Sequence, residues 1–271
     1  TKGVFDFLII SLFATPYPKF FLDKYILILG YFFSILYFKI LSLELSKKNL
    51  GYGVGNNKII KKSKTPFVFI LSPDVILKRN CEENLLKSIN KLKYNFSMLS
   101  PISKIKNYGF FKKEIISKDS LFEVDYVNGF AILMNKIKIN NVGMFDDKIF
   151  LYTEEIDLCK RLKSANQKIY INKNAKVIHL AAKASSIGFE SDKCRNWHWM
   201  WSQVYFAKKY SNSFLVYSKF TMLLIVQLIK IIFYIMLFNK KEAINKTMRL
   251  SGTLNSLLGR SSWYRPKFNF D

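Results

Sequence analysis

Between residues 49 and 200, short runs of strand-forming residues alternate with polar stretches at helical spacing, and this alternation limits the possible folds most strongly. The clearest strand is Pro66–Leu71, an apolar run that ends in a Ser-Pro-Asp turn. The clearest helix is Cys81–Leu92, where apolar residues recur three or four positions apart. The pattern predicts an α/β fold in which helices flank a sheet.

Further elements follow from the same patterns. Thr153 precedes a short helical stretch from Glu154 to Leu162, and its hydroxyl is predicted to cap that helix. Apolar runs with β-branched residues predict the remaining strands. These strands are Tyr126-Val127 and Phe130–Met134 on either side of Gly129, Lys168–Ile171, and Ala175–His179.

Changes in hydrophobicity and charge along the sequence divide the chain into three predicted parts. Residues 1–48 are apolar and aromatic, residues 49–210 form the α/β part, and residues 211–271 are hydrophobic and then basic. The three cysteines are scattered, without the spacing of a zinc site, and read as reduced thiols.

The C-terminal part contains the most hydrophobic stretch, Phe220–Phe238, in which Lys230 is the single charged residue. The stretch is long enough to cross a bilayer, but Gln227 and Lys230 near its middle are costly in hydrocarbon. We therefore predict an amphipathic helix that associates with a membrane surface, with its lysines reaching the headgroups. A helix packed on the α/β domain is the alternative.

The formal net charge is +24, from 43 Lys and Arg against 19 Asp and Glu. This excess favours anionic partners such as acidic lipids or phosphorylated substrates, or it reflects a composition biased toward Lys. No zinc-finger, RNA-recognition or basic-helix pattern is present in the sequence, so a nucleic-acid partner is not predicted.

The segment Asn49–Asn57 is rich in glycine and asparagine. Glycine lets a backbone approach a ligand closely, and the Asn side chains can both donate and accept hydrogen bonds. The third glycine is misplaced for a dinucleotide-binding motif. The segment is predicted to be a loop, either at a ligand site or as a plain turn.

Two residues end predicted strands with groups that can bind metal. Asp74 follows the strand Pro66–Leu71, at the sheet edge where open α/β folds hold ligands, and its carboxylate suits magnesium or manganese. His179 ends the strand Ala175–His179. A turn role for Asp74 and a structural role for His179 remain the alternatives.

Acidic residues cluster between Asp146 and Asp157, where five of the 19 acids of the chain lie. Glu154 and Asp157 are three positions apart and share one helix face, and Asp157 can pair with Arg161 four positions on. In so basic a chain, this clustering indicates a site that holds a metal or accepts a proton.

Taken in order, these segments resemble the family 2 glycosyltransferases, particularly the rhamnosyltransferase-like branch that builds bacterial surface polysaccharides. The resemblance runs from Asn49 to about Tyr210, and it depends on the order and spacing of several short motifs. The matching segments are Asn49–Asn57, Phe69–Val75, Val124–Gly129, Gly143–Asp146, Phe150–Arg161 and Ala175–His179, followed by Ser185 and Ser186.

The resemblance implies a GT-A fold, a nucleotide-diphosphate sugar donor, a divalent metal (Mg or Mn), and inversion at the anomeric carbon. The corresponding function is transfer of a sugar such as rhamnose to a cell-envelope polysaccharide or lipid-linked glycan. It also implies a cytoplasmic protein, peripheral at the inner face of the plasma membrane. The implied residue roles are Glu155 as catalytic base; Gly129, Glu154 and Asp157 at the acceptor; Asn49, Gly51, Gly53, Asn56 and Asp74 at the donor; and Asp74 and His179 at the metal.

Three departures from the family pattern keep other functions open. Glu155 stands where the family usually has Asp, and Ser72 where it has Asn or an acid. Phe7–Ser11 fits the first strand, but residues 1–48 lack the nucleotide-binding motif of the second. The alternatives are a catalytically inactive homologue that binds glycan or another enzyme, and a non-enzymatic membrane protein anchored by residues 25–38 and 220–238.

Overall fold

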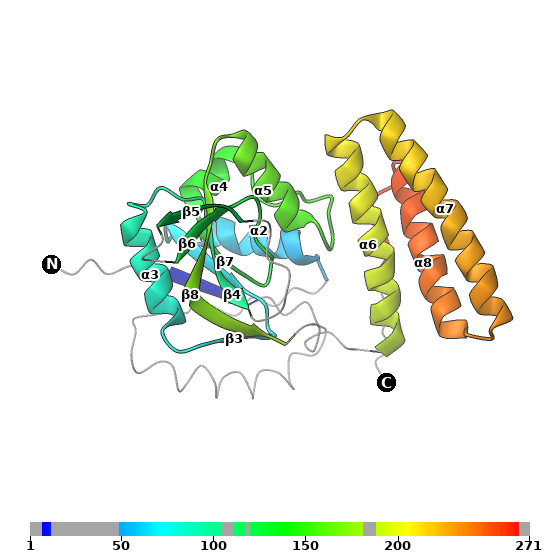
Figure 1. Ribbon diagram of the computed structural model, residues 1–271, viewed down its shortest axis with the longest axis horizontal. Coiled ribbons are helices and arrows are strands. Elements are labelled where there is room, and N and C mark those ends of the chain that lie inside the picture. Colours follow the sequence, from blue (N-terminus) through cyan, green and yellow to red (C-terminus); the bar gives the residue numbers. More distant parts are fainter. Residues whose placement is uncertain (1–6, 12–48, 104–110, 117–119, 181–187, 266–271) are drawn as a thin grey trace. The chain divides into compact units, whose positions relative to one another are not determined.

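The computed structural model describes residues 7–11, 49–103, 111–116, 120–180 and 188–265 (Figure 1). The chain forms two compact units. The sheet unit comprises Thr1–Asp146 and Glu155–Ala184, and the helical unit comprises Asp147–Glu154 and Ser185–Asp271. The predicted features at residues 12–48 and at Ser185-Ser186 lie outside the described residues.

The sheet unit is built on one eight-stranded mixed sheet in the order β1-β2-β7-β4-β8-β6-β5, with β3 paired to β8. β1 is parallel to β2 and β4 is parallel to β8, while β7 runs antiparallel between β2 and β4. The strands are β1 (Phe7–Ser11), β2 (Phe67–Leu71), β3 (Val75–Leu77), β4 (Met98–Ser103), β5 (Phe111–Ile116), β6 (Leu121–Val124), β7 (Ala131–Asn135) and β8 (Ile169–His179).

Helices cover both faces of this sheet, which confirms the predicted α/β class (Figure 1). One apolar cluster joins α2 (Tyr52–Lys62), α4 (Lys136–Val142) and α5 (Glu154–Ser164) to one face. A second cluster joins α3 (Cys81–Lys91) to the other. Alternate residues of β2 enter the two clusters, as expected for a strand buried on both sides.

The helical unit consists of α6 (Gly188–Tyr210), α7 (Ser213–Met236) and α8 (Lys240–Leu257), together with the segment Asp147–Glu154. α6 and α8 approach closely: a Cβ atom on Gly252 would lie 2.2 Å from the carbonyl oxygen of Trp197. We expected the C-terminal part to begin after residue 210, but the structure groups α6 with α7 and α8.

Four local predictions were wrong. Tyr126 and Val127 do not form a strand, because β6 ends at Val124 and β7 begins at Ala131. The strands expected at Lys168–Ile171 and Ala175–His179 are one continuous strand, β8. The segment Asn49–Asn57 is not a loop throughout, because α2 begins at Tyr52. Thr153 does not cap α5: its φ is 66°, and its buried hydroxyl makes no hydrogen bond within the described part of the chain.

Candidate active site

The sheet topology brings several strand ends to one edge of the sheet unit. β2 and β4 both run antiparallel to β7, and β8 is parallel to β4, so β2, β4 and β8 end on the same side. β7 starts on that side, with Ala131 opposite Leu71. Ser72 donates its backbone N–H to the carbonyl of Phe130 at 2.8 Å and closes this corner. Residues that follow β2, precede β7 or end β8 are therefore neighbours.

Asp74 and His179 meet at this edge. The Nε2 atom of His179 lies 3.3 Å from Oδ2 of Asp74, although the two residues are far apart in sequence. The pairing of β3 with β8 produces the contact, since Val75 is opposite His179. The His179 ring also stacks on Phe130, with 4.7 Å between the ring centroids. Asp74 is largely buried, with 9% of its side chain exposed, and His179 is partly exposed.

The pair fits two neighbouring ligands of a divalent cation. Adjacent ligand atoms in octahedral coordination at 2.0–2.1 Å are about 3 Å apart, close to the 3.3 Å found here. In the described residues, no group of three or more His, Cys, Asp and Glu side chains is arranged to hold a metal. Among the described residues, Asp74 and His179 would hold the ion.

Glu155 lies at the same edge through Gly129, the second residue before β7. Burial raises the pKa of the Glu155 carboxyl group above its usual range, while backbone hydrogen bonds at Glu155 itself and at Gly129 act in the opposite direction. A carboxyl group with a raised pKa holds a proton more strongly near neutral pH, which suits a general base. The structure therefore brings Glu155, Gly129 and the Asp74–His179 pair to one side of the sheet.

Tyr52 supports this corner, and sequence reasoning did not single it out. Its hydroxyl donates a hydrogen bond to the carbonyl oxygen of Gly129. A Cβ atom on Gly129 would lie 3.3 Å from the Tyr52 ring, so the close approach leaves little room for a larger residue. The Tyr52 ring also meets Phe145 edge-on, with 5.6 Å between centroids. The sequence feature that points to Tyr52 is its position as an aromatic residue between Gly51 and Gly53.

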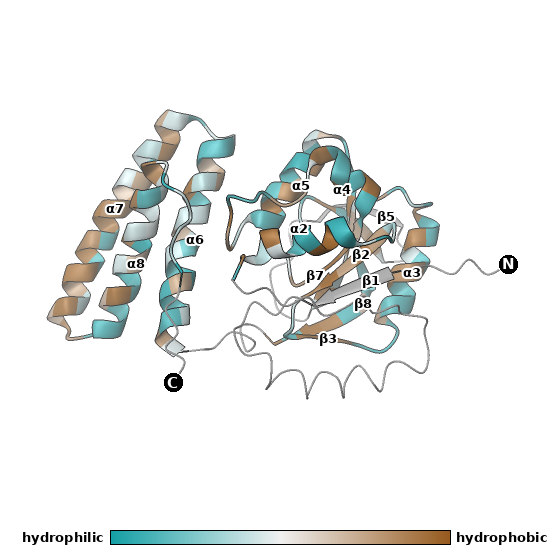
Figure 2. Cartoon of the chain, turned by 180° about the vertical axis from the view of Figure 1, so that it is seen from behind, coloured by the Kyte–Doolittle hydropathy of each residue, from teal (hydrophilic) through white to brown (hydrophobic). Residues whose placement is uncertain are grey.

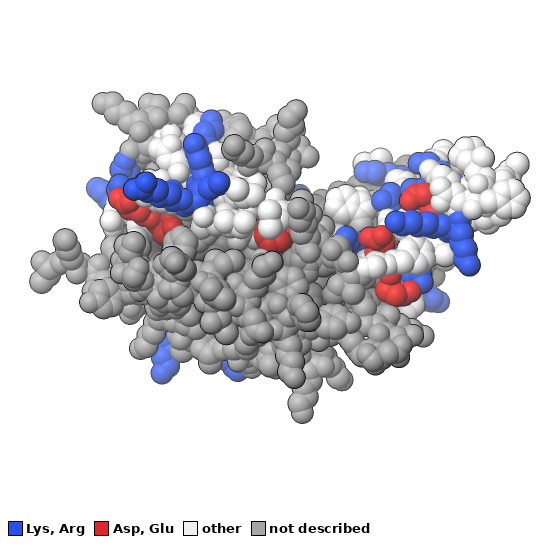
Figure 3. Space-filling view, turned by 90° about the horizontal axis from the view of Figure 1, so that it is seen from below, with Lys and Arg blue, Asp and Glu red and all other residues white. Residues whose placement is uncertain are grey.

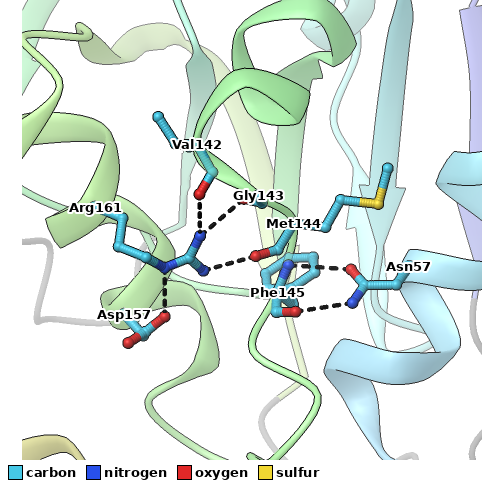
Figure 4. Close-up of polar contacts among 7 residues, drawn as sticks. All are labelled: Asn57, Val142, Gly143, Met144, Phe145, Asp157 and Arg161. Atoms are coloured by element: carbon cyan, nitrogen blue, oxygen red, sulfur yellow. Dashed lines mark hydrogen bonds and ion pairs between the residues drawn. The ribbon is translucent and has the colours of Figure 1, made fainter. Parts of the chain in front are cut away.

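Asp157 is fully buried and pairs with Arg161, as the four-residue spacing predicted. The Arg161 Nε atom donates to Oδ2 of Asp157 at 2.8 Å (Figure 4). The rest of the guanidinium group donates to the carbonyl oxygens of Val142, Gly143 and Met144 at 2.6–2.9 Å. These contacts give Asp157 a structural role, and its acceptor-binding role stays a prediction, as does that of the buried Glu154.

The asparagines at the start of α2 also make structural contacts. Asn57 holds the backbone of Phe145 at two points: its amide group donates to the carbonyl at 2.8 Å, and its Oδ1 accepts from the N–H at 3.1 Å (Figure 4). Asn56 is fully buried and donates to the Tyr52 carbonyl. Asn49 accepts from the N–H of Gly51 at 3.0 Å. Donor-binding roles for Asn49, Gly51, Gly53 and Asn56 therefore stay predictions.

Comparisons with known proteins agree with this fold. None of the sequence models of known protein families matches the chain. A likeness in fold links it to the mannosyltransferase PcManGT from Pyrobaculum calidifontis, solved with GDP-Man and Mn2+, at a TM-score of 0.50 and 8% identity over 93% of this chain and 87% of that one. The chain spans only 37% of another glycosyltransferase, GalNAc-T7, at a TM-score of 0.47 and 13% identity.

The fold is thus GT-A-like, as expected. In sequence, the chain is 25% identical to the rhamnosyltransferase WbbL of Escherichia coli (strain K12), over 189 residues that cover 59% of this chain and 71% of WbbL. Together, these likenesses support the expected resemblance to the family 2 glycosyltransferases.

Proposed function

We propose that the chain is an inverting glycosyltransferase that moves a sugar from a nucleotide-diphosphate donor to a hydroxyl group of a glycan acceptor. The observation that carries the proposal is that the Asp74–His179 pair and Glu155, which is held at Gly129, lie on the same side of the sheet. The sequence likeness to a rhamnosyltransferase supports glycosyl transfer, and the GT-A-like fold supports a nucleotide-sugar donor.

In this mechanism, Glu155 accepts the proton of the acceptor hydroxyl as its oxygen attacks the anomeric carbon. The bond from that carbon to the diphosphate breaks, and the nucleoside diphosphate leaves with the bonding electron pair. A magnesium or manganese ion held by Asp74 and His179 would supply positive charge to offset the charge that develops on the leaving diphosphate. Gly129 orients the base through its backbone, and Tyr52 fixes Gly129.

For the substrates, we propose a deoxythymidine-diphosphate sugar such as dTDP-rhamnose as donor, and a cell-envelope polysaccharide or lipid-linked glycan as acceptor. The rhamnosyltransferase WbbL supports this choice of sugar. The net charge of +24 supports anionic substrates on both sides of the reaction.

The test is calorimetric titration of dTDP-, UDP- and GDP-sugars into the protein, with and without manganese. We expect metal-dependent binding that Asp74→Ala abolishes. Glu83→Ala is the matched control, because Glu83 is an exposed acid of α3 that pairs with Lys87 and lies in the same unit. Glu155→Gln should retain donor binding and lose turnover.

No binding to any nucleotide sugar would overturn the proposal in favour of an inactive homologue. Two observations favour that second candidate: Glu155 is one methylene longer than the usual Asp, and residues 1–48 contain no recognisable nucleotide motif. Displacements near 1 Å at a catalytic group can be costly, so the longer side chain is a real cost to test. Glu155→Asp separates the two, since a working enzyme would retain or gain activity.

A further inference from the structure

α7 exposes a long apolar surface that no described residue of the helical unit covers. It is the one helix in the described ranges that is long and apolar enough to cross a membrane, yet only 11% of its most apolar stretch is buried. In Figure 2, α7 is brown along much of its length. Six of its large exposed residues lie along one side at helical spacing: Phe214, Met222, Ile225, Ile229, Ile232 and Met236.

The opposite side of α7 packs within the helical unit. Val216, Phe220 and Gln227 are buried, and the first two join an apolar cluster with residues of α6 and α8. A soluble surface helix places polar residues opposite its buried stripe. α7 instead has apolar residues on both sides, so its outer surface requires an apolar partner.

The charged residues of α7 itself are all basic. α7 contains no Asp or Glu, and its two charged residues are Lys219 and Lys230. They are eleven residues apart, about three helical turns, and therefore lie on the same flank. Lys240 and Lys241 follow at the start of α8. Figure 3 shows basic side chains on the helical unit beside acidic and uncharged ones, and the acidic Glu242 of α8 lies 3.2 Å from Lys246.

α8 determines how α7 can meet a lipid bilayer. The Tyr217 hydroxyl of α7 donates to the carbonyl of Leu257 at 3.4 Å, and Lys246 of α8 lies 5.7 Å from the ring centre of Tyr234. The two helices therefore pack antiparallel over about 25 Å. α8 is rich in charge, so an α7 that crossed a bilayer would carry its partner's charges into hydrocarbon.

We propose that α7 lies flat along a membrane surface that bears anionic headgroups. Its outer apolar side enters the boundary of the acyl chains, and Lys219 and Lys230 reach the headgroup phosphates from the flank. The charge complementarity of the acid-free helix selects an anionic lipid surface as the occupant. The proposal concerns the helical unit alone and does not depend on glycosyl transfer.

Vesicle flotation of the full chain tests this directly, using neutral phosphatidylcholine vesicles and vesicles with added phosphatidylglycerol. We expect binding to the anionic vesicles, weakened about tenfold or more by Ile229→Glu. Ile137→Glu is the matched control, because Ile137 is an isoleucine of α4 in the sheet unit with 65% exposure against 61% for Ile229. The control should bind as the wild type does.

Lysine variants test the electrostatic part. Each of Lys219→Gln and Lys230→Gln should weaken binding to anionic vesicles about fivefold and leave the weak binding to neutral vesicles unchanged. Equal binding of the wild-type chain to neutral and anionic vesicles would overturn the choice of an anionic surface. A chain that self-associates through α7 without lipid and fails to float would overturn the membrane proposal as a whole.

Depth measurements distinguish a flat helix from a crossing one. Single cysteines at Met222, Ile229 and Met236, seven residues apart on one side, carry an environment-sensitive dye. The three native cysteines are buried, and burial raises the pKa of their thiols to about 11 or 12, which limits their labelling. Equal depth at all three sites supports the proposal, whereas a deep middle site with shallow ends would overturn it.

Discussion

The two units handle polar and apolar groups in opposite ways. The sheet unit brings buried or half-buried polar groups (Asp74, His179 and Glu155) to one sheet edge, where backbone and aromatic contacts position them. The helical unit buries polar side chains such as Gln227 between helices and exposes large apolar residues on α7. A buried polar group and an exposed apolar surface both carry a cost in free energy, and both indicate a partner.

The four tryptophans give the experimental means to follow the units separately. Trp197, Trp199, Trp201 and Trp263 all lie in the helical unit. The buried thiols of Cys81 and Cys159 lie in the sheet unit. Tryptophan fluorescence therefore reports unfolding of the helical unit, and labelling of these two thiols reports opening of the sheet unit.

The largest expected effect is on turnover in the sheet unit. Glu155→Gln should lower kcat by about 100- to 10,000-fold, because a positioned general base contributes that much. Sugar transfer assayed with a saturating donor measures the change. Tryptophan fluorescence and vesicle flotation should be unaffected. A loss of membrane binding in this variant would contradict the assignment of turnover and membrane binding to separate units.

Arg161→Ala should destabilise the sheet unit by about 3–5 kcal/mol, since it removes one side of a buried ion pair together with three hydrogen bonds to the carbonyls of Val142, Gly143 and Met144. Urea unfolding followed by labelling of Cys81 and Cys159 measures this. The exposed Lys87→Ala on α3 serves as control and should cost less than about 1 kcal/mol. Similar losses in both variants would contradict the role assigned to Arg161.

The two units should respond to pH in opposite directions. Burial lowers the pKa of His198 to about 4, so its stabilising contribution is present above pH 6.5 and is lost as the pH falls toward 4. The loss should reach at most about 3 kcal/mol. For Glu155, whose pKa is raised, the contribution is present at low pH and is lost as the pH rises through that pKa.

Unfolding curves between pH 4 and 7.5 test this contrast. His198→Gln should flatten the acid side of the fluorescence-detected curve, and Glu155→Gln should flatten the alkaline side of the thiol-labelling curve. If wild type and His198→Gln lose stability in parallel below pH 6.5, another group is responsible in the helical unit.

Gly252→Ala should destabilise the helical unit by about 1–3 kcal/mol, because the added methyl group must move the backbone of α6 at Trp197. Leu254→Ala, at an exposed position of the same helix, is the control. Tryptophan fluorescence during urea unfolding should show the shift in the first variant. An unchanged midpoint would mean that the two helices separate at little cost.

The parts of the fold predicted from sequence are those that local patterns determine. The strand at Phe67–Leu71 and the helix at Cys81–Lys91 have unbroken apolar spacing, and both were found. The sequence predicted two strands in place of β8 because Asn172 interrupts the apolar pattern. In the structure, Asn172 Oδ1 accepts from the N–H groups of Asn174 and Ala175 at 2.7 and 3.2 Å, where the register with β4 shifts. These hydrogen bonds let the strand continue through a polar residue, and they form only in the folded sheet.

The candidate site divides in the same way. Asp74 and His179 were each predicted from their positions at strand ends, but their contact follows from the pairing of β3 with β8, which no local pattern encodes. The helix at Tyr52 was missed because glycines disfavour helices in isolation. Here, distant contacts from Asn57 to Phe145 and burial of Ile60 stabilise it.

The chain leaves the sheet unit at Asp146, contributes eight residues to the helical unit, and returns at Glu155. Within the helical unit, Ser202 and Ser262 donate to the carbonyls of Leu151 and Lys148, at 2.7 and 2.8 Å. A chain truncated after residue 184 would therefore lose the two serines that bind the segment Asp147–Glu154. A fragment that starts at residue 185 would lack that segment. The units are distinct in packing but interleaved in sequence. Replacing the whole helical unit by another domain would therefore also replace Glu154, the residue next to the proposed base Glu155.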